Sequence, residues 1–343
     1  MVSALAVAGL LSAAFFVPFL LLLASFPAYL RFLTRRGRVW DDVHKRPVVK
    51  VPAPAGPILF LAVLAGELAV ALISESLIPV AITMGTGVAF AVGLVDDLYV
   101  LGGRTKPLLL FLAGLAFVGV ILVNPSLYTP VLFFPLIHNT SPHFIIYTLL
   151  AIVAFPIVAN AFNMMDSFNG QISWFTLLTS LALLVGVALR TAFTGFSVVR
   201  AATVLPLVAV SAVFLLYNRH PARAFDGDSG ALMFGAMFAG LAVAGGVEVA
   251  AIIAIVPAIL NSFYTLSSVR GFVERRQMKS RPTFLGEDGL MHASTDPGAP
   301  TTLIRLILLA GPLGERELVK DIVKLTVVAC VLSIIISVLT WVP

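Results

Sequence analysis

The chain has 343 residues, of which 59% are hydrophobic and only 11% are charged. Its mean hydropathy of +1.04 excludes an ordinary water-soluble domain, and its length admits about ten membrane-spanning helices of about 20 apolar residues each. The formal charge of +5 does not indicate a nucleic-acid partner, because the basic residues lie between apolar segments, where they report membrane topology. The single cysteine, Cys330, excludes a disulfide framework and a cysteine metal site.

The apolar segments predict ten spanning helices joined by mostly short connections. They lie at about residues 4–30, 55–73, 77–95, 107–123, 144–163, 172–189, 201–217, 229–245, 247–268 and 320–342. The first segment has no preceding basic region and is too long for a signal-peptide core, so we expect a retained helix. The predicted fold class is an all-α integral membrane protein, with residues 1–343 forming one multi-pass catalytic domain.

Basic residues are concentrated in alternate connections. Of the 22 lysines and arginines, 20 lie in loops 31–54, 96–106, 218–228 and 269–319 or at the start of the last segment, whereas only Arg190 and Arg200 lie opposite. The positive-inside rule therefore predicts that these loops, together with loop 164–171, are cytoplasmic and that both termini are outside. Fourteen of the 17 acidic residues share that side. Since acidic residues contribute little to orientation, we expect the cytoplasmic face of the cell membrane to carry the chemistry.

An acidic pair, Asp96-Asp97, ends the third apolar segment, and Lys106 follows shortly after it. Ionisable groups at a membrane boundary are costly and usually functional. The alternative is that the pair only marks where a helix leaves the bilayer. We select all three residues as catalytic candidates.

A row of polar residues closes the fifth apolar segment. Asn160 and Asn163 are three residues apart and share a helix face that Asp166 continues, and Asn169-Gly170 is a turn signal. The alternative role for these asparagines is hydrogen bonding between membrane helices. The turn is predicted to present backbone groups to a ligand.

The run Phe225-Asp226-Gly227-Asp228-Ser229-Gly230 precedes the eighth apolar segment. Its glycines permit a close backbone approach, and the start of the following helix offers unpaired amides to an anion. Asp and Asn oxygens are hard ligands suited to Mg²⁺ or Mn²⁺. A simple helix cap at Asp228 and Ser229 is the alternative.

The long cytoplasmic loop 269–319 contains a basic run and a short apolar stretch. The run comprises Arg275, Arg276, Lys279 and Arg281, which fit a topology determinant, an anionic-lipid contact or a clamp for nucleotide phosphates. Residues 301–310 are too short to span a bilayer and are typical of an interfacial helix.

Four motifs, in this order, resemble the polyprenyl-phosphate N-acetylhexosamine-1-phosphate transferases of the glycosyltransferase 4 type. They are Asp42-Val-His-Lys45, Gly93-Leu-Val-Asp96-Asp97 with Lys106, Asn160-Ala-Phe-Asn163, and the segment from Asn218 through Pro221 to Asp228. The tail from Thr302 to Arg316 is similar to that of the eukaryotic dolichyl-phosphate GlcNAc-1-phosphate transferase. Because the chain lacks that enzyme's large insertions, the resemblance implies an archaeal relative in protein glycosylation or surface glycan assembly.

The resemblance implies a Mg²⁺-dependent transferase, with Mn²⁺ as an alternative metal. Asn163 and Asp228 correspond to metal ligands, Lys106 to a phosphate contact, and Asp96 and Asp97 to the essential acidic pair. The other implied substrate-binding residues are Lys45, Asn160, Asp166, Asn169, Phe225, Arg275, Arg276, Lys279 and Arg281. The implied partners are a UDP-N-acetyl sugar, a polyprenyl (dolichol-type) phosphate, membrane lipid and a second copy in a homodimer.

The sequence departs from the family pattern at three places. Bacterial members usually have Asp-Gly-x-Asp-Gly where this chain has Asp166-Ser-Phe-Asn169-Gly170, and the eukaryotic form lacks an acid at the position of Asp166. Arginines and lysines replace the family's histidine-bearing motif in loop 269–319. Ala53 stands where the eukaryotic enzyme has an acidic residue.

The predicted reaction transfers a sugar 1-phosphate, GlcNAc-1-phosphate by resemblance, from a UDP-sugar to a polyprenyl phosphate. The products are lipid diphosphate-sugar and UMP, the first intermediate of lipid-linked glycan assembly. The alternative is a transporter or flippase of anionic or lipid-linked solutes. Transporters often have charges near the bilayer midplane and two repeated halves, whereas here the polar residues gather at one face and no halves repeat.

Overall fold

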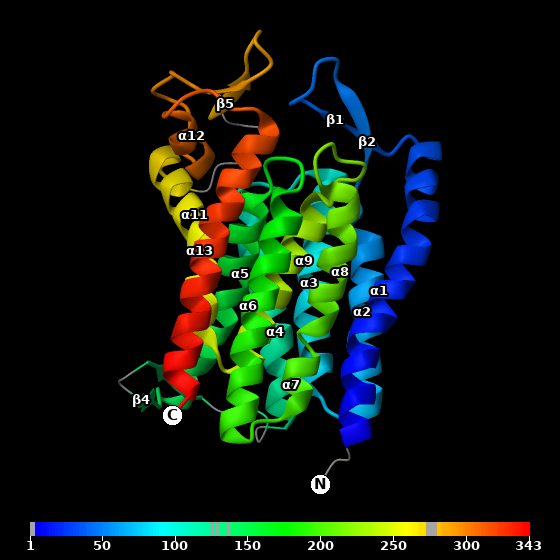
Figure 1. The fold of residues 1–343 in the computed structure, drawn as a ribbon, viewed down its shortest axis with the longest axis vertical. Helices are drawn as coiled ribbons and strands as arrows, with labels where there is room; N and C mark the ends of the chain where they lie inside the picture. Colours follow the sequence, from blue (N-terminus) through cyan, green and yellow to red (C-terminus); the bar gives the residue numbers. More distant parts are fainter. Residues whose placement is uncertain (1–3, 125–126, 128–129, 136–137, 272–279) are drawn as a thin grey trace.

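The structure is a computed structural model that describes residues 4–124, 127, 130–135, 138–271 and 280–343. The chain folds into a bundle of long, roughly parallel and antiparallel helices (Figure 1). The helices are α1 (Ala4–Arg35), α2 (Gly56–Ser74), α3 (Ile78–Tyr99), α4 (Thr105–Val123), α5 (Phe144–Met165), α6 (Gln171–Thr194), α7 (Val198–Ala202), α8 (Leu205–Asn218), α9 (Gly227–Gly245), α10 (Glu248–Ala254), α11 (Val256–Val269), α12 (Leu303–Leu308) and α13 (Glu315–Trp341).

Within the described ranges, nine helical segments are long and apolar enough to cross a membrane, with α7 and α8 taken together as one segment. A tenth is added if α10 and α11 are one span, bent by 66° at Ile255. Pro257 follows the bend directly and removes a backbone donor from the first turn of α11. The predicted all-α membrane fold is confirmed, and each apolar segment corresponds to one of these spans.

Within the described residues, three short antiparallel hairpins join the helices and were not predicted. They are β1 (Val39–Asp42) with β2 (Val49–Pro52), β3 (Leu132–Phe134) with β4 (His138–Thr140), and β5 (Thr283–Leu285) with β6 (Met291–Ala293). Strands of three or four residues are too short to produce a period-2 pattern, so the sequence there indicates only connections. The short interfacial helix expected at residues 301–310 corresponds to α12.

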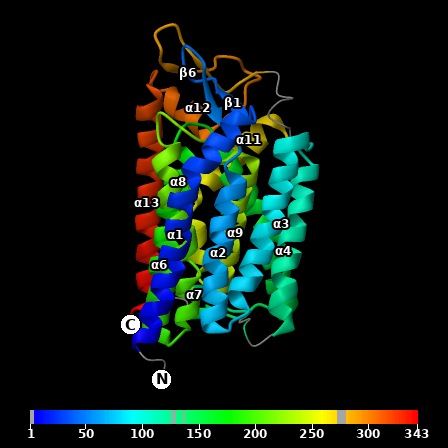
Figure 2. The same cartoon turned by 90° about the vertical axis from the view of Figure 1, so that its right-hand side faces the viewer.

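The two ends of the bundle differ in content. Hairpins β1–β2 and β5–β6 and helix α12 lie at one end, whereas both termini and the β3–β4 hairpin lie at the other (Figures 1 and 2). Both termini therefore lie at the end opposite the longest polar connections, as the predicted alternation of loops requires. Which end faces the cytoplasm stays a prediction.

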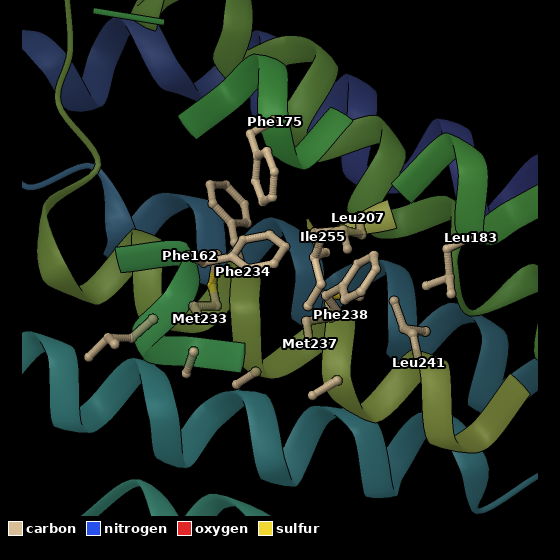
Figure 3. Close-up of a cluster of buried hydrophobic side chains, with 14 of the residues drawn as sticks. Phe162, Phe175, Leu183, Leu207, Met233, Phe234, Met237, Phe238, Leu241 and Ile255 are labelled. Carbon is tan, nitrogen blue, oxygen red and sulfur yellow. The ribbon is translucent and has the colours of Figure 1, made fainter. Parts of the chain in front are cut away.

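Helix α9 forms the centre of the bundle. All but two of its residues, Asp228 and Val243, are buried, and it packs mainly against α3 and α5. Its aromatic side chains meet those of neighbouring helices: the ring centroids of Phe238 and Phe162 are 5.5 Å apart, and Phe162 packs edge-on against Phe175 of α6 (Figure 3). Small residues allow close approach on another face, where a Cβ added to Gly235 would lie 2.6 Å from the Cα of Ala159 in α5.

Two buried arginines hold the C-terminal end of α9. Arg190 donates to the carbonyl of Gly245 at 2.8 Å, and Arg200 donates to the carbonyl of Ala244. Both guanidinium groups also lie over the ring of Phe196, at 3.6 and 4.2 Å from its centroid. The only two basic residues that lie opposite the cationic loops are therefore bound inside the protein, which explains their exception to the charge asymmetry.

Candidate active site

Four helix ends meet at the end of the bundle that carries the β1–β2 hairpin. The C-terminal ends of α3 and α5 bring Asp96 and Asn163 beside Lys106 and Asp228, which lie in the first turns of α4 and α9. The ammonium group of Lys106 lies 2.5 Å from Asp96 Oδ2 and 3.2 Å from Asp228 Oδ2. The amide nitrogen of Asn163 lies 2.5 Å from Asp228 Oδ1. Residues separated by more than 130 positions thus form one polar cluster.

Asp97 binds the start of α9 from across the helix interface. Its Oδ1 accepts from the backbone amide of Asp228 at 2.8 Å, and its Oδ2 accepts from the amide and hydroxyl of Ser229 at 3.0 and 2.5 Å. A carboxylate at these free amides satisfies donors that the helix cannot and complements the positive end of the helix dipole. Asp97 therefore fixes the position of Asp228.

Glycines permit this close contact between α3 and α9. A Cβ added to Gly93 would lie 2.5 Å from the carbonyl oxygen of Asp228, and one added to Gly227 would lie 2.7 Å from Asp97 Oδ2. Gly227 also has φ of +74°, a backbone conformation that favours glycine. A larger residue at either position would displace the carboxylates that the site brings together.

Asp226, two residues before Asp228, is 1% exposed. Neither of its carboxylate oxygens has a hydrogen-bond partner within the described part of the chain. Burial raises the pKa of Asp226 well above its usual range, and the negative charge of Asp166 raises it further. Buried polar groups rarely lack a hydrogen-bond partner, so a bound water or a cation next to Asp226 would satisfy its carboxyl oxygens.

A second polar network ties together the loops above the cluster. Glu315, the first residue of α13, forms an ion pair with Lys45, lies 3.2 Å from His220 Nδ1 and accepts from the backbone amide of Asn169 at 3.0 Å. The side-chain amide of Asn169 in turn donates to Asp42 Oδ2 at 2.8 Å. We call these five residues the Glu315 clasp. It joins the β1–β2 hairpin, the turn after α5, the loop before α9 and the last helix.

A cavity of about 190 Å³ opens beside the clasp. Its lining includes Asp166, Asn169 and Phe225, together with Asp42, His44 and Gly227. The ring of His44 stacks on Phe168 with centroids 4.3 Å apart. Three predicted substrate-binding residues from two separate motifs therefore share one concave surface next to the polar cluster.

The remaining predicted binding residues lie apart from this surface or outside the described residues. Asn160 donates to the carbonyl of Pro156 on its own helix at 2.7 Å, and Lys45 is bound by Glu315 rather than facing the cavity. Arg281 is exposed. Arg275, Arg276 and Lys279 lie outside the described residues. The substrate-binding roles of all six stay predictions, as do those of the three residues that line the cavity.

The donor atoms of the cluster are suited to a hard divalent cation. Asp228 supplies a carboxylate and Asn163 an amide, and Mg²⁺ typically takes one or two protein carboxylates, with waters and substrate phosphates completing its shell. Within the described ranges, no group of three or more His, Cys, Asp or Glu residues is placed to hold a metal ion. The amide nitrogen of Asn163 faces Asp228 here, and a half-turn of the amide would present its oxygen instead.

Sequence reasoning missed several residues of the site, among them Asp42 of the clasp. Ser229 and Asp226 lie inside a motif that was recognised, but only the structure shows that one binds Asp97 and the other is buried without a partner. His220 and Glu315 belong to motifs of the sequence but had no predicted role. Glu315 follows the Gly-Pro-Leu-Gly turn at the start of a spanning helix, and an acid there was a signal that could have been followed.

The residues of the polar cluster lie within a segment that matches a known protein family. The model of glycosyl transferase family 4 matches residues 79–246, which include Asp96, Lys106, Asn163 and Asp228. These residues, just under half of the chain, are similar to glycosyl transferase family 4. This similarity favours an enzyme over the transporter or flippase that the sequence left as the alternative.

Three similar proteins match most of the chain. A "putative glycosyltransferase" of Methanocaldococcus jannaschii is 29% identical over 86% of this chain and 87% of its own length. A "putative UDP-N-acetylglucosamine--dolichyl-phosphate N-acetylglucosaminephosphotransferase" of Sulfolobus acidocaldarius is 23% identical over 89% and 90%. A "probable undecaprenyl-phosphate N-acetylglucosaminyl 1-phosphate transferase" of Bacillus subtilis is 29% identical over 65% of this chain and 59% of its own.

Proposed function

We propose that this chain transfers N-acetylglucosamine 1-phosphate from UDP-GlcNAc to a polyprenyl or dolichyl phosphate. The names of the Sulfolobus and Bacillus relatives support this sugar and these acceptors. The observation that carries the proposal is the convergence of Lys106, Asp96, Asn163 and Asp228 at one end of a membrane bundle, beside a cavity. A water-soluble donor and a membrane-bound acceptor would meet there.

In this reaction, a phosphate oxygen of the acceptor attacks the sugar-bound phosphorus of the UDP-sugar. The bond from that phosphorus to the bridging oxygen breaks, and UMP leaves with the bond's electron pair. A phosphate monoester has its second pKa near 6, so at neutral pH most of the acceptor is already ionised and needs no strong general base. Positioning and charge neutralisation carry such a transfer.

Each residue of the cluster has a defined task in this proposal. Lys106, held between two carboxylates, places one positive charge where the transferred phosphate gathers negative charge. Asn163 and Asp228 would hold Mg²⁺, which neutralises diphosphate oxygens when bound. Asp97 keeps the start of α9 in place, and Asp96 orients Lys106.

The membrane sidedness and the metal are parts of the same proposal. The cationic loops support a cytoplasmic location for the site, since the positive-inside rule concerns short loops of this kind. The oxygen donors of Asn163 and Asp228 support Mg²⁺, with Mn²⁺ as a substitute. The homodimer stays a prediction.

The purified protein should release UMP from UDP-GlcNAc only when both a polyprenyl phosphate and Mg²⁺ are present. Chelation by EDTA should stop the release, and added Mg²⁺ should restore it. No release from any UDP- or CDP-sugar with the acceptor present would contradict the transferase activity.

The variant Asp228→Asn tests the metal ligand. It keeps the shape of the side chain but removes one charge, so activity should fall about 100-fold or more and the Mg²⁺ concentration for half-maximal rate should rise. Asp321→Asn, on an exposed turn of α13, is the matched control and should keep full activity. Full activity in Asp228→Asn would remove the metal-ligand assignment.

A further inference from the structure

A second hollow, a groove that shares Trp40 with the cavity beside the clasp, runs between the ends of α1 and α3. Its volume is about 440 Å³, and its lining includes Phe32, Arg36, Arg38, Trp40, Leu94 and Leu98. Asp97 is the only residue of the acidic pair in its lining, and Asp96, Lys106, Asn163 and Asp228 are absent from it. We call it the α1–α3 groove.

The walls of the α1–α3 groove are mainly apolar, and several of them are open to the surroundings. Phe32 is 51% exposed, Leu98 45% and Trp40 37%. Phe32 and Leu98 lie near the ends of two helices that span the membrane, and Trp40 follows the first of these helices in β1. Aromatic side chains commonly lie at the level of lipid headgroups in such positions. Such walls suit an acyl chain better than water.

Two guanidinium groups line the same groove. Within the described residues, neither Arg36 nor Arg38 forms an ion pair with a carboxylate. The guanidinium carbon of Arg36 lies 5.6 Å from the ring centroid of Phe32, so charge and apolar wall adjoin. A pair of arginines without carboxylate partners at a membrane boundary is the chemistry that recognises a phosphate group.

The single acid in the groove is already bound elsewhere. Both carboxylate oxygens of Asp97 accept hydrogen bonds from Asp228 and Ser229 at the start of α9. With the two arginines, the groove still carries a net positive charge. An anionic headgroup at Arg36 and Arg38 is therefore favoured.

The groove is held in shape by the backbone. The amide of Arg38 donates to the carbonyl of Leu33 at 2.9 Å, and the carbonyl of Arg38 accepts from Ala53 at 3.2 Å. The hydroxyl of Tyr29 donates to the carbonyl of Pro54 at 3.0 Å, which ties α1 to the segment before α2. The loop that carries the arginines is thus anchored on both sides.

We propose that the α1–α3 groove binds an anionic glycerophospholipid of the surrounding bilayer. Its phosphodiester lies against Arg36 and Arg38, and one acyl chain lies along Phe32 and Leu98. A phospholipid is favoured over the lipid acceptor because Lys106, Asn163 and Asp228 are absent from the lining of the groove. Since Asp97 lines the groove and holds α9, bound phospholipid supports the position of Asp228.

Native mass spectrometry of the full-length protein in detergent tests the proposal without any sugar nucleotide or acceptor. Phosphatidylglycerol and phosphatidylcholine with identical acyl chains are offered in equal amounts. The wild type should retain phosphatidylglycerol preferentially. This preference should fall about fivefold in Arg36→Gln and in Arg38→Gln, because one basic residue near an anionic lipid contributes about 1 kcal/mol.

The matched control is the pair Arg31→Gln and Arg35→Gln, exposed positions in the last turns of α1 that do not line the groove. It should leave the preference unchanged, and an equal loss would show a general surface attraction and overturn the proposal. Leu98→Trp, which fills the groove but keeps both arginines, should abolish retention. Leu112→Trp, a comparably exposed leucine on α4, should not.

Two further results would overturn the proposal. One is a polyprenyl phosphate that binds with the same dependence on Arg36 and Arg38 while phosphatidylglycerol does not bind. The other is a preference that exists only in dimers and disappears with them in Leu98→Trp, which would make the groove an interface between copies.

If the variants fail to fold, a photoreactive acyl chain on phosphatidylglycerol should label Phe32 or Leu98 in the wild type. Labelling only at other residues would contradict the assignment.

Discussion

Asp96 and Asp97 are adjacent in the sequence, yet their side chains serve different helices. Asp96 is 3% exposed, pairs with Lys106 of α4 and accepts a hydrogen bond from the amide of Leu101. Asp97 turns to α9 and binds Asp228 and Ser229. Residues one apart on a helix point about 100° apart, so an acidic pair can hold two neighbours at once. The sequence indicated that both were functional, and the structure separates their contacts.

Asp97→Asn should damage the site more than Ser229→Ala. The asparagine amide would turn a donor toward the donors of α9, whereas Ser229→Ala removes only one hydrogen bond, worth about 1 kcal/mol. We expect a fall in activity of about 100-fold for Asp97→Asn and less than about tenfold for Ser229→Ala. UMP release and thermal melting measure both effects, and equal loss in the two variants would contradict the role of Asp97 in holding α9.

At the scale of elements, the contact between α3 and α9 decides the geometry of the site. These two helices share the largest interface in the described bundle, and Gly93 lies against the backbone of Asp228 and Ser229. Close helix contacts of this kind depend on small residues. The position of Asp228 is thus set by a residue that has no chemistry of its own.

Gly93→Ala should reduce activity at least about tenfold, because its methyl group would push the start of α9 away from Lys106 and Asn163. Gly119→Ala, in α4 with no atom within 4 Å of the added carbon, is the matched control. It should keep activity and stabilise its helix slightly, by up to about 1 kcal/mol. Retained wild-type rates in Gly93→Ala would show that α3 and α9 can separate without cost to catalysis.

The Glu315 clasp acts at the same scale, since one side chain joins the last helix to three distant loops. Glu315→Gln should release Lys45 and His220 and loosen Asn169, which lines the cavity. We expect KM for the UDP-sugar to rise about tenfold, as for a loss of about 1.4 kcal/mol, with KM for the lipid acceptor unchanged. Steady-state kinetics with each substrate varied separately measure the difference.

Glu317→Gln is the control for the clasp, because Glu317 is exposed and its ion-pair partner is the exposed Lys320, at 4.0 Å. It should leave both KM values unchanged. If kcat fell and the KM values of both substrates rose alike in Glu315→Gln, the loops would be unfolding generally, and a role at the donor side would be contradicted.

The spans and their alternation could be predicted from the sequence, because an uncharged apolar run of about 20 residues has the length and composition of a membrane helix. The pairing of Lys106 with Asp96 and Asp228, and of Asp97 with Ser229, could not be predicted. Such contacts depend on how helices rotate against one another, and this is set by small residues such as Gly93 rather than by hydrophobicity. The clasp could not be predicted from the sequence either, since Lys45 and Glu315 are 270 residues apart.

At the scale of the whole molecule, the end of the bundle with the polar cluster should face the cytoplasm. Glu287→Cys lies in the β5–β6 hairpin at that end, and Thr140→Cys ends the β3–β4 hairpin at the other. In intact cells, a membrane-impermeant maleimide should label only Thr140→Cys, and permeabilisation should expose both. The natural Cys330 is buried and should stay unlabelled, and the reverse pattern would invert the topology.

Helix α9 is held at both ends by opposite charges. Asp97 binds its first amides, and Arg190 and Arg200 bind its last carbonyls, 19 residues or about 28 Å away. A strut fixed in this way tolerates no change in length: one inserted residue would turn Asp228 by about 100° relative to Lys106. The position of Asp228 at one end of the bundle therefore depends on contacts at the other end. Substitution of Arg190 or Arg200, far from any substrate, should reduce the catalytic rate.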